Sequence, residues 1–433
     1  MKRTLSWLLG LCVFALIAVA VSWLVYMPPK AVRGVWQTEG YGLVLDVSAT
    51  TIDVYQASDL HCHRDIRIPA HLWLVNFLEG ATFTQEGDRL KIALSEGLNP
   101  VYADPIGILP TTCTAPPAVT AQATFDVMWE VMNTHYAHFD THGVDWAARK
   151  SFRPDPQAND ATLWKALQDA LSGLDDGHTY IAASDQVWSP AIAPDWHNDR
   201  HLMRDTTLAT VADISEPNAF GLQAGFAAPG IGYVFMAHMD PDTALGQTPA
   251  DAATNAFGQI IDYFQANETK ALILDLRYNP GGTDNVSMAY AGFFTQSSLP
   301  VFRKQTRTTT GMTAPFTATL TPQDTHWPGP VILLTTRYTA SAAEIFTLAM
   351  RELPQVVTLG EPTSGGLSDV MTTTLPNGWV LGLSNQVYET NDGGAYEATG
   401  IPPDVPFPVD IPAAQAGTDT MLAAAIARLQ ESP

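Results

Sequence analysis

The hydrophobic pattern changes character along the chain, and its first part is typical of short strands. Between residue 34 and about residue 110, β-branched and aromatic runs alternate with Gly, Ser and Asp. Turn signals recur roughly every ten residues, which predicts a small antiparallel β-domain, a half-barrel or a sandwich. The expected strands are residues 34–36, 41–47, 51–55, 72–77, 81–84 and 90–94. The Pro-rich stretch 105–117 is expected to be a linker.

A helical period replaces this pattern after the linker. Phe125, Met128 and Met132 are spaced as on one helix face, and leucines 163, 167, 171 and 174 form a second stripe. We interpret both stripes as core, which predicts a helical module over residues 124–174. The polar, Pro-rich residues 186–220 are expected to form a loop or an extended crossing segment.

From Gly221 onward, strand-like and helical segments alternate. Apolar runs predict strands, and longer stretches with one apolar face predict helices. The expected strands are residues 232–236, 271–276, 331–334 and 355–359, and the expected helices are residues 250–266 and 342–353. This order predicts an α/β fold with a mostly parallel sheet covered on both faces.

The amino terminus carries a long apolar run. Lys2 and Arg3 precede 23 uncharged residues from Leu5 to Met27. A secretory signal core is ~7–15 residues and a membrane-spanning helix needs ~20, so the length favours a signal anchor over a cleaved signal peptide. Residues 18–20, Ala-Val-Ala, still allow cleavage and secretion.

Charge excludes one class of partner. The chain has 44 acidic and 22 basic side chains, a net charge of −22. Nucleic-acid binding needs basic residues concentrated on one face, so we expect no nucleic-acid partner.

The cysteines point to an oxidising compartment. Cys12 lies in the apolar run, which leaves Cys62 and Cys113 as a pair in the rest of the chain. In an exported protein such a pair predicts a disulfide, the alternative being two buried thiols. His61 and His63 flank Cys62, but without a fourth ligand at a suitable spacing we expect no metal site.

Candidate chemistry begins with Ser341, which follows an expected strand and opens an expected helix. At such a turn the Ala342 N–H group can donate to an oxyanion, and the Gly281-Gly282 turn offers a second donor. The chain has no Lys after Ser341, so we expect His178 to be the base, oriented by Glu397 or Asp404.

Each of these residues also has a purely structural interpretation. Ser341 and Glu344 have the spacing of a helix-capping box. His178, in a turn, resembles many surface or capping histidines, and Glu397 resembles a solvated loop carboxylate. The catalytic hypothesis therefore depends on the segments occurring together.

Three of the segments together resemble a known family. They are residues 274–282 (LDLRYNPGG), 338–344 (YTASAAE) and 359–366 (LGEPTSGG). This combination resembles the C-terminal processing (tail-specific) serine peptidases and their tricorn-core and interphotoreceptor-retinoid-binding-protein relatives, over residues 124–410. The resemblance implies a crotonase-like catalytic core beside the helical module.

The resemblance also implies roles for individual residues. The nucleophile corresponds to Ser341, and the oxyanion donors correspond to Ala342 and to Gly281 or Gly282. The processing peptidases have a Lys base where this chain has Gly366, which excludes a Ser–Lys mechanism. In the tricorn-like branch a His from the helical module and a late Glu act instead, and His178 and Glu397 match these positions. Residues 179–220 are too few for the ~90-residue PDZ insertion that many processing peptidases carry.

We therefore expect a serine peptidase that works through an acyl-enzyme with a Ser341–His178–Glu397 arrangement, without metal or other cofactor. Its partners would be a peptide or protein substrate and, through the first segment, a membrane, with the catalytic domain extracytoplasmic. The expected parts are residues 1–30 as signal segment, 31–117 as β-domain with linker, 118–185 as helical module and 186–433 as catalytic domain. The alternatives are a relative without activity that binds a peptide or lipid, and an esterase or amidase acting on small acyl substrates.

Overall fold

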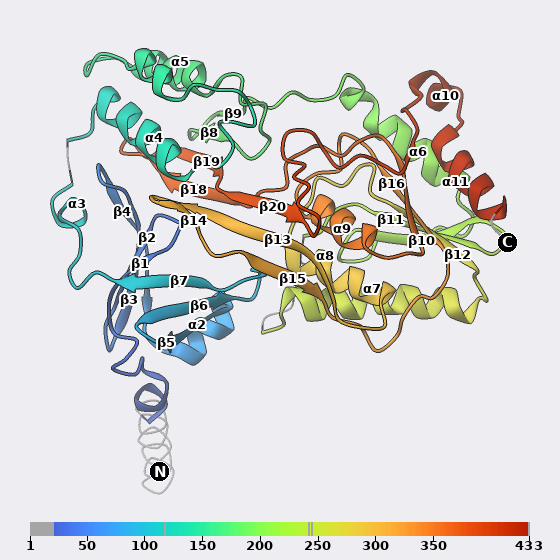
Figure 1. Ribbon diagram of the computed structural model, residues 1–433, viewed down its shortest axis with the longest axis horizontal. Coiled ribbons are helices and arrows are strands. Elements are labelled where there is room, and N and C mark those ends of the chain that lie inside the picture. The colour runs from blue at the N-terminus through green and yellow to red at the C-terminus, as the bar shows by residue number, and fades with distance from the viewer. Residues whose placement is uncertain (1–20, 117, 241–242, 244–245, 432–433) are drawn as a thin grey trace, which may run out of the picture. The chain divides into compact units, whose positions relative to one another are not determined.

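The computed structural model describes residues 21–116, 118–240, 243 and 246–431. Its contacts divide the chain into two compact units (Figure 1). The first unit comprises residues 1–95 and 99–118, and the second comprises residues 96–98 and 119–433. The finer boundaries expected at residues 30 and 185 stay predictions. Among the described residues, no helix has the length and apolar character needed to cross a membrane, and most of the predicted run Leu5–Met27 lies outside them.

The first unit is built on one seven-stranded antiparallel sheet with the order β4-β3-β2-β1-β7-β6-β5. Alternating side chains such as Trp36, Ile52 and Leu90 form its core. A disulfide joins Cys62 in β4 to Cys113 in the short helix α3 (Thr111–Thr114), as expected from the sequence. The strands are β1 (Gly34–Thr38), β2 (Leu43–Val47), β3 (Thr51–Ala57), β4 (Cys62–Pro69), β5 (Ala81–Glu86), β6 (Arg89–Leu94) and β7 (Val101–Pro105).

One expected strand in this unit is wrong. Residues 72–77 belong to helix α2 (Leu72–Glu79), which the side chain of His71 caps by accepting a hydrogen bond from the Leu74 N–H at 3.2 Å. Gly80 ends the helix in the left-handed conformation, with φ 60°. A short apolar run fits a strand and a helix equally well, so the two terminal signals decide.

The second unit contains the predicted, mostly parallel sheet. Its strand order is β10-β11-β12-β16-β17-β21, and every neighbouring pair except β10–β11 is parallel. The apolar runs predicted as buried strands form its centre. The strands are β10 (Leu222–Ala228), β11 (Ile231–Met236), β12 (Ala271–Asp275), β16 (Val331–Thr335), β17 (Val356–Gly360) and β21 (Val405–Pro406).

Helices cover both faces of this sheet, as predicted. One face packs against side chains of α7, α8 and α9, and the other against side chains of α6, α10 and α11. Part of the loop or extended segment expected at residues 186–220 is in fact helix α6. Only Met203 and Thr207 of this helix are buried, so the sequence has no clear apolar stripe that would predict it. The helices are α6 (Arg200–Thr210), α7 (Pro249–Ala266), α8 (Asp284–Ala291), α9 (Ala342–Arg351), α10 (Ile411–Gln415) and α11 (Thr420–Glu431).

The predicted helical module consists mainly of α4 (Ala121–His135) and α5 (Asp160–Leu171). Its two stripes share one core with Leu381 and Leu383 of β19 (Val380–Ser384). The strand that follows the module, β8 (Tyr180–Ala182), pairs with β19. The loop between α5 and β8 is therefore held at both ends.

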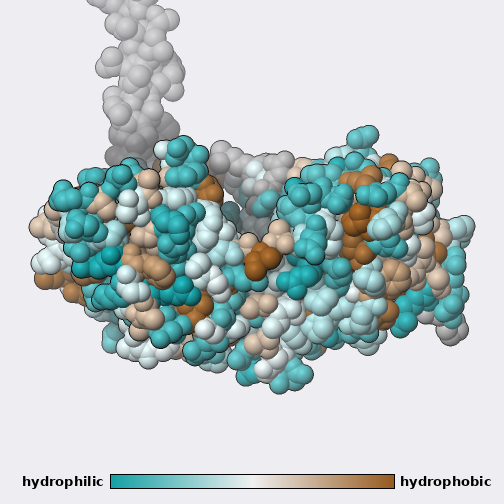
Figure 2. Space-filling view, turned by 90° about the horizontal axis from the view of Figure 1, so that it is seen from above, coloured by the Kyte–Doolittle hydropathy of each residue, from teal (hydrophilic) through white to brown (hydrophobic). Residues whose placement is uncertain are grey.

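Two further strands, β13 (Leu299–Thr308) and β20 (Gln386–Thr390), pair antiparallel, and β20 precedes the segment that contains Glu397. The face in Figure 2 is mostly hydrophilic, with apolar residues in small groups.

Candidate active site

Ser341 lies at the turn from β16 into α9, in a conformation that few non-glycine residues adopt. Its backbone has φ 54° and ψ −129°. Such a conformation costs of order 1–3 kcal/mol and persists only where the surroundings enforce it. In α/β-hydrolases, a sharp, strained strand-to-helix turn presents a nucleophilic serine. The next residue, Ala342, is the first of the helix, where N–H groups have no acceptor within the helix.

The carboxylate of Glu344 holds this turn in place. Its Oε2 accepts hydrogen bonds from the N–H groups of Ser341 at 3.1 Å and Gly366 at 2.8 Å. Its Oε1 accepts from the Thr363 hydroxyl at 2.6 Å and from the Gly365 N–H at 2.8 Å. Glu344 is fully buried, and burial raises its pKa to about 7 although these four donors act in the opposite direction. One side chain thus fastens the serine turn to the loop 363–366.

The Gly281-Gly282 turn lies directly against Ser341. A Cβ atom on Gly281 would come within 2.5 Å of the Ser341 Cβ and 3.0 Å of the Ala342 nitrogen. The Gly281 N–H donates to Asn279 Oδ1 at 2.9 Å. The Met239 N–H donates a hydrogen bond to the Gly281 carbonyl, and the Thr283 N–H donates one to the Met239 carbonyl. The Gly282 N–H takes no part in this pairing.

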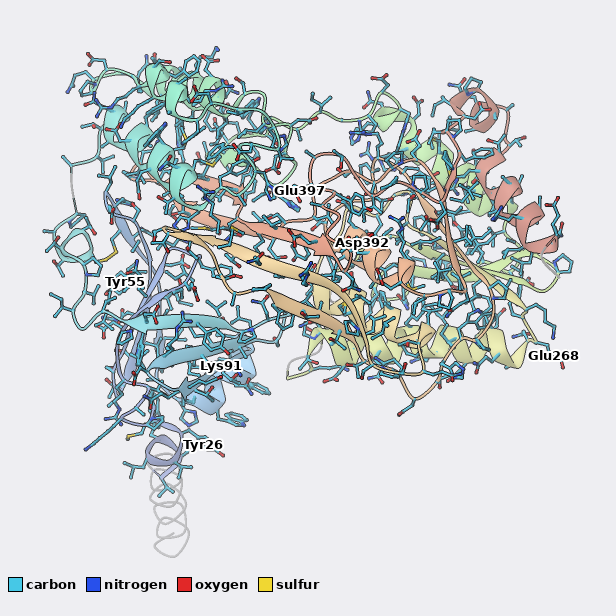
Figure 3. All side chains as sticks on the ribbon, viewed as in Figure 1. Tyr26, Tyr55, Lys91, Glu268, Asp392 and Glu397 are labelled. Atoms are coloured by element: carbon cyan, nitrogen blue, oxygen red, sulfur yellow. A yellow bond between two sulfur atoms is a disulfide. The ribbon has the colours of Figure 1, made fainter. Side chains whose placement is uncertain are left out.

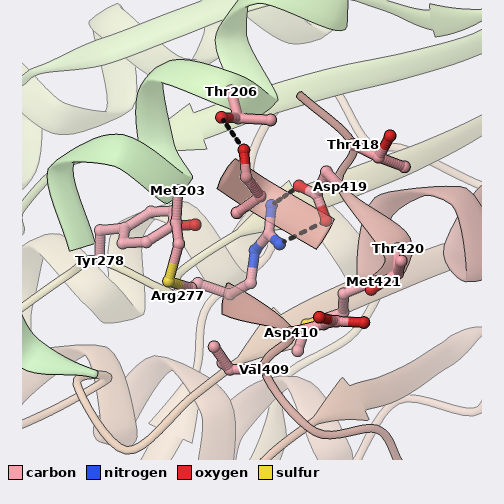
Figure 4. A pocket seen from close by; sticks show the side chains of 11 residues that line it. Met203, Thr206, Arg277, Tyr278, Val409, Asp410, Thr418, Asp419, Thr420 and Met421 are labelled. Atoms are coloured by element: carbon pink, nitrogen blue, oxygen red, sulfur yellow. Dashed lines mark hydrogen bonds and ion pairs between the residues drawn. The ribbon is translucent and has the colours of Figure 1, made fainter. Parts of the chain in front are cut away.

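A buried ion-pair cluster fixes the strand that leads into this turn. Arg277 forms an ion pair with Asp275 at 2.7 Å. It forms a second with Asp419, also at 2.7 Å, which Figure 4 shows. Tyr233 donates a further hydrogen bond to Asp275 at 2.7 Å. Because the Arg277 and Asp275 side chains are 2% and 0% exposed, their charges depend on one another. The main chain is therefore anchored at Asp275 and Arg277, a few residues before Gly281.

His178 is in the loop between α5 and β8, and Asp176 shapes that loop. Asp176 Oδ1 accepts from the His178 N–H at 2.8 Å and from the Ser384 hydroxyl at 3.1 Å. A Cβ atom on Gly366 would lie 3.9 Å from His178 Cε1 and 3.9 Å from Glu344 Oε2. Gly366, whose carbonyl accepts from the Ser341 N–H at 3.0 Å, therefore links the imidazole to the serine turn.

Glu397 is buried in the segment between β20 and β21 (Figure 3). Its Oε2 accepts from the N–H groups of Leu367 at 2.9 Å and Ser368 at 3.1 Å. Burial raises the pKa of Glu397 well above its usual value; the charges of Asp176 and Glu344 raise it further, whereas the two N–H groups lower it. Glu397 is thus close enough to Asp176 and Glu344 to share their electrostatic field.

The expected hydrogen bond between His178 and Glu397 is not formed. His178 Nδ1 is buried and has no hydrogen-bond partner among the described residues. The alternative orienting residue, Asp404, is engaged elsewhere: its Oδ2 accepts from the Thr358 N–H and hydroxyl, each at 2.9 Å. The structure therefore brings together five of the site residues: Ser341, Gly281, Gly366, Glu344 and His178. Glu397 is next to this group, because it accepts a hydrogen bond from the N–H of Leu367, which follows Gly366.

Comparison with known proteins now bears on this arrangement. Residues 230–407, which include the Gly-Gly turn, Ser341 and Glu397, match the model of peptidase family S41. These matched residues belong to peptidase family S41.

Several relatives match this chain over parts of their length. Carboxyl-terminal-processing peptidase 2 of Arabidopsis thaliana is 27% identical over 195 residues, 44% of this chain and 34% of the relative. The tail-specific protease of Haemophilus influenzae is 28% identical over 161 residues, 35% of this chain and 22% of the relative. The match thus spans about a third or less of the length of these curated relatives.

Solved structures match over more of this chain. A structure from Parabacteroides merdae ATCC 43184 has a TM-score of 0.62 at 27% identity and covers 73% of this chain and 98% of that one. Mature CPAF has a TM-score of 0.56 at 12% identity, covering 72% of this chain and 98% of that one. At 12% identity the likeness concerns the fold alone.

Three features of the S41 site are missed by sequence reasoning. From the sequence, Glu344 is identified only as a capping residue, although the same carboxylate also binds loop 363–366. Asn279 occupies the Gly281 N–H, which the Gly-Gly pattern does not reveal. Asp419 is 142 positions from its partner Arg277, and no local motif connects them.

Proposed function

We propose that the chain is a serine peptidase that cleaves peptide bonds through an acyl-enzyme. The observation that carries this proposal is the conformation of Ser341, held at φ 54° at the start of α9 beside a glycine turn. A serine that only caps a helix has no need of this conformation, because helix-capping residues normally have extended backbones.

In the proposed reaction, Ser341 Oγ attacks the substrate carbonyl carbon and its proton passes to the His178 imidazole. The tetrahedral intermediate collapses as the C–N bond breaks, and the imidazolium returns the proton to the leaving amine. Water then attacks the ester with His178 again as base, which releases the acid and restores the Ser341 hydroxyl.

The negatively charged oxygen of the intermediate would receive hydrogen bonds from two main-chain N–H groups. Ala342 supplies the first. Of the two glycines considered, we assign the second to Gly282, because the Gly281 N–H already donates to Asn279. In comparable enzymes, one such donor contributes ~3–4 kcal/mol to the barrier reduction.

We assign the base to His178 rather than to a lysine, as in the tricorn-like branch. Gly366 replaces the lysine of the processing peptidases, and the space beside its Cα is bordered by the His178 ring and Glu344. We assign Glu397 to electrostatic stabilisation of the imidazolium, since it does not hydrogen-bond the imidazole. Its pKa is raised in the resting site, and an imidazolium nearby would lower that pKa and favour the carboxylate.

The remaining parts of the proposal concern fold and location. We assign the second unit to the crotonase-like fold, with the helical module beside it. The Cys62–Cys113 disulfide supports an extracytoplasmic catalytic domain, since such bonds persist in oxidising compartments. The apolar run Leu5–Met27 supports a membrane anchor, or secretion if it is cleaved.

A fluorophosphonate probe with the Ser341→Ala variant tests the catalytic assignment. We expect the wild type to be labelled and to cleave casein, and Ser341→Ala to lose both properties. Its melting temperature should fall by only a few degrees, since loss of a helix cap costs ~1 kcal/mol. The variant Ser151→Ala, at an exposed position in the helical module, is the control and should keep both.

The same experiment separates the alternative functions. An unlabelled wild type would overturn the proposal in favour of a peptide- or lipid-binding relative, which the missing His178–Glu397 hydrogen bond favours. Labelling with hydrolysis of a short ester but not of casein would indicate an esterase or amidase instead.

A further inference from the structure

The first unit carries an aromatic cluster that the proposed catalysis does not use. It joins helical residues 21–26 to helix α2. The rings of Trp23 and Tyr26 lie 5.3 and 5.1 Å from that of His71, and Trp73 stacks on Phe77 at 5.1 Å. Tyr26 lies at one end of the first unit (Figure 3).

Much of this cluster is exposed to solvent. Trp73 and Leu78 of α2 are 50% and 55% exposed, and Leu24 and Val25 are 68% and 66% exposed. Of the eight residues of α2, only Val75 is buried. We define the apolar patch as Val21, Leu24, Val25, Tyr26, Trp73 and Leu78. Large apolar side chains gathered on a surface indicate an interaction site.

We propose that the apolar patch lies in the interfacial layer of a lipid bilayer and seats the first unit on the membrane. Val21, Leu24, Val25 and Tyr26 belong to the end of the uncharged run Leu5–Met27. The ring of Tyr26 lies 6.5 Å from that of Trp73, so the patch joins the end of this run to α2. Trp and Tyr concentrate at the boundary between hydrocarbon and headgroups, because their rings are apolar and their N–H or O–H groups bond water. Lys30 and Arg33 follow the patch and suit anionic headgroups.

The distribution of charge supports a lipid partner. Apart from Lys2 and Arg3, which precede the apolar run, the first unit has six basic and nine acidic side chains, whereas the rest of the chain has 14 and 35. An anionic bilayer repels a strongly acidic surface and tolerates a nearly neutral one. The unit that bears the patch is therefore the one that can lie against such a membrane.

Fluorescence depth measurement tests this placement on the full chain. An environment-sensitive fluorophore is attached at Trp73→Cys or Leu78→Cys in a Cys12→Ala background, and the protein is reconstituted into vesicles of phosphatidylcholine and phosphatidylglycerol. Asp88→Cys, in the exposed turn between β5 and β6, is the matched control in the same unit. Far-UV circular dichroism and retention of the Cys62–Cys113 disulfide establish that each labelled protein is folded.

We expect emission from positions 73 and 78 to shift to the blue and to be quenched by lipids with nitroxide-labelled acyl chains, with position 88 unaffected. Equal, water-like emission at all three positions would overturn the proposal. Nanodiscs that hold one chain each distinguish the partner: a blue shift that persists there supports lipid. A shift lost there would assign the patch to contact between copies and would also overturn it.

Discussion

Substituting Gly281 by alanine tests whether the Gly-Gly turn and Ser341 form one site. The new methyl group would lie 2.5 Å from Ser341 Cβ and 2.7 Å from the Ala340 carbonyl, whereas ordinary contacts begin at 3.4 Å. The serine turn must therefore move by about 1 Å, a displacement that can reduce turnover ~100-fold when it separates reacting atoms. Gly281 also has φ 106°, which adds backbone strain of ~1–3 kcal/mol in any L-residue.

A second glycine separates the displacement from the strain. Gly378 has φ 86°, but a Cβ there would have no atom within 4 Å. Gly378→Ala should lose a similar ~1–3 kcal/mol of stability and keep its activity per folded molecule. The assay is the rate of fluorophosphonate labelling together with kcat on a peptide substrate, each corrected for the folded fraction from urea unfolding. If Gly281→Ala labels and turns over within a few-fold of Gly378→Ala, the Gly-Gly turn has no part in the site.

Three further perturbations bear on stability. Replacing Cys62 and Cys113 by alanine should lower the unfolding free energy of the first unit by ~4 kcal/mol, since the bridge closes a loop over 51 positions; an unchanged urea midpoint would contradict this. Arg277→Met should lower the unfolding free energy, measured in urea, by ~3–5 kcal/mol, because the buried carboxylates of Asp275 and Asp419 lose their positive partner. A urea transition like that of the wild type would show that the cluster is unimportant to folding. Because the pKa of Glu344 is raised to about 7 from 4.5, the fold favours its protonated form, and that stabilisation is lost as pH rises through this window. The stability of the wild type relative to Glu344→Gln should thus fall by ~3 kcal/mol between pH 4.5 and 7.5, and a difference constant with pH would refute the assignment.

The sequence suffices to predict the elements whose apolar pattern is long or fully buried. The central strands and helix α7 follow from runs such as residues 271–276 and 250–266. It fails for α2 and α6: the first is short and apolar on nearly every side, and the second buries only two residues. Where periodicity is weak, capping groups and tertiary contacts determine the structure, and these appear only in the folded chain.

The site shows a similar division. That Ser341, His178 and the Gly-Gly turn approach one another follows from motifs at the ends of strong elements. The choice between Gly281 and Gly282 does not, because it depends on which N–H group Asn279 occupies. The missing bond between His178 and Glu397 is likewise a matter of side-chain geometry that no spacing encodes.

Three buried carboxylates explain how such distant loops converge. Asp176 accepts from the His178 N–H, Glu344 from the Ser341 N–H, and Glu397 from the Leu367 N–H. Each fixes main chain beside the site, and their mutual repulsion contributes to the raised pKa of Glu397. In the proposed reaction, the imidazolium formed when Ser341 gives up its proton would lower the raised pKa values of Glu344 and Glu397 and be stabilised by their ionised forms. The carboxylates that position the loops would therefore also favour the proton transfer, without a direct hydrogen bond from Glu397 to the ring.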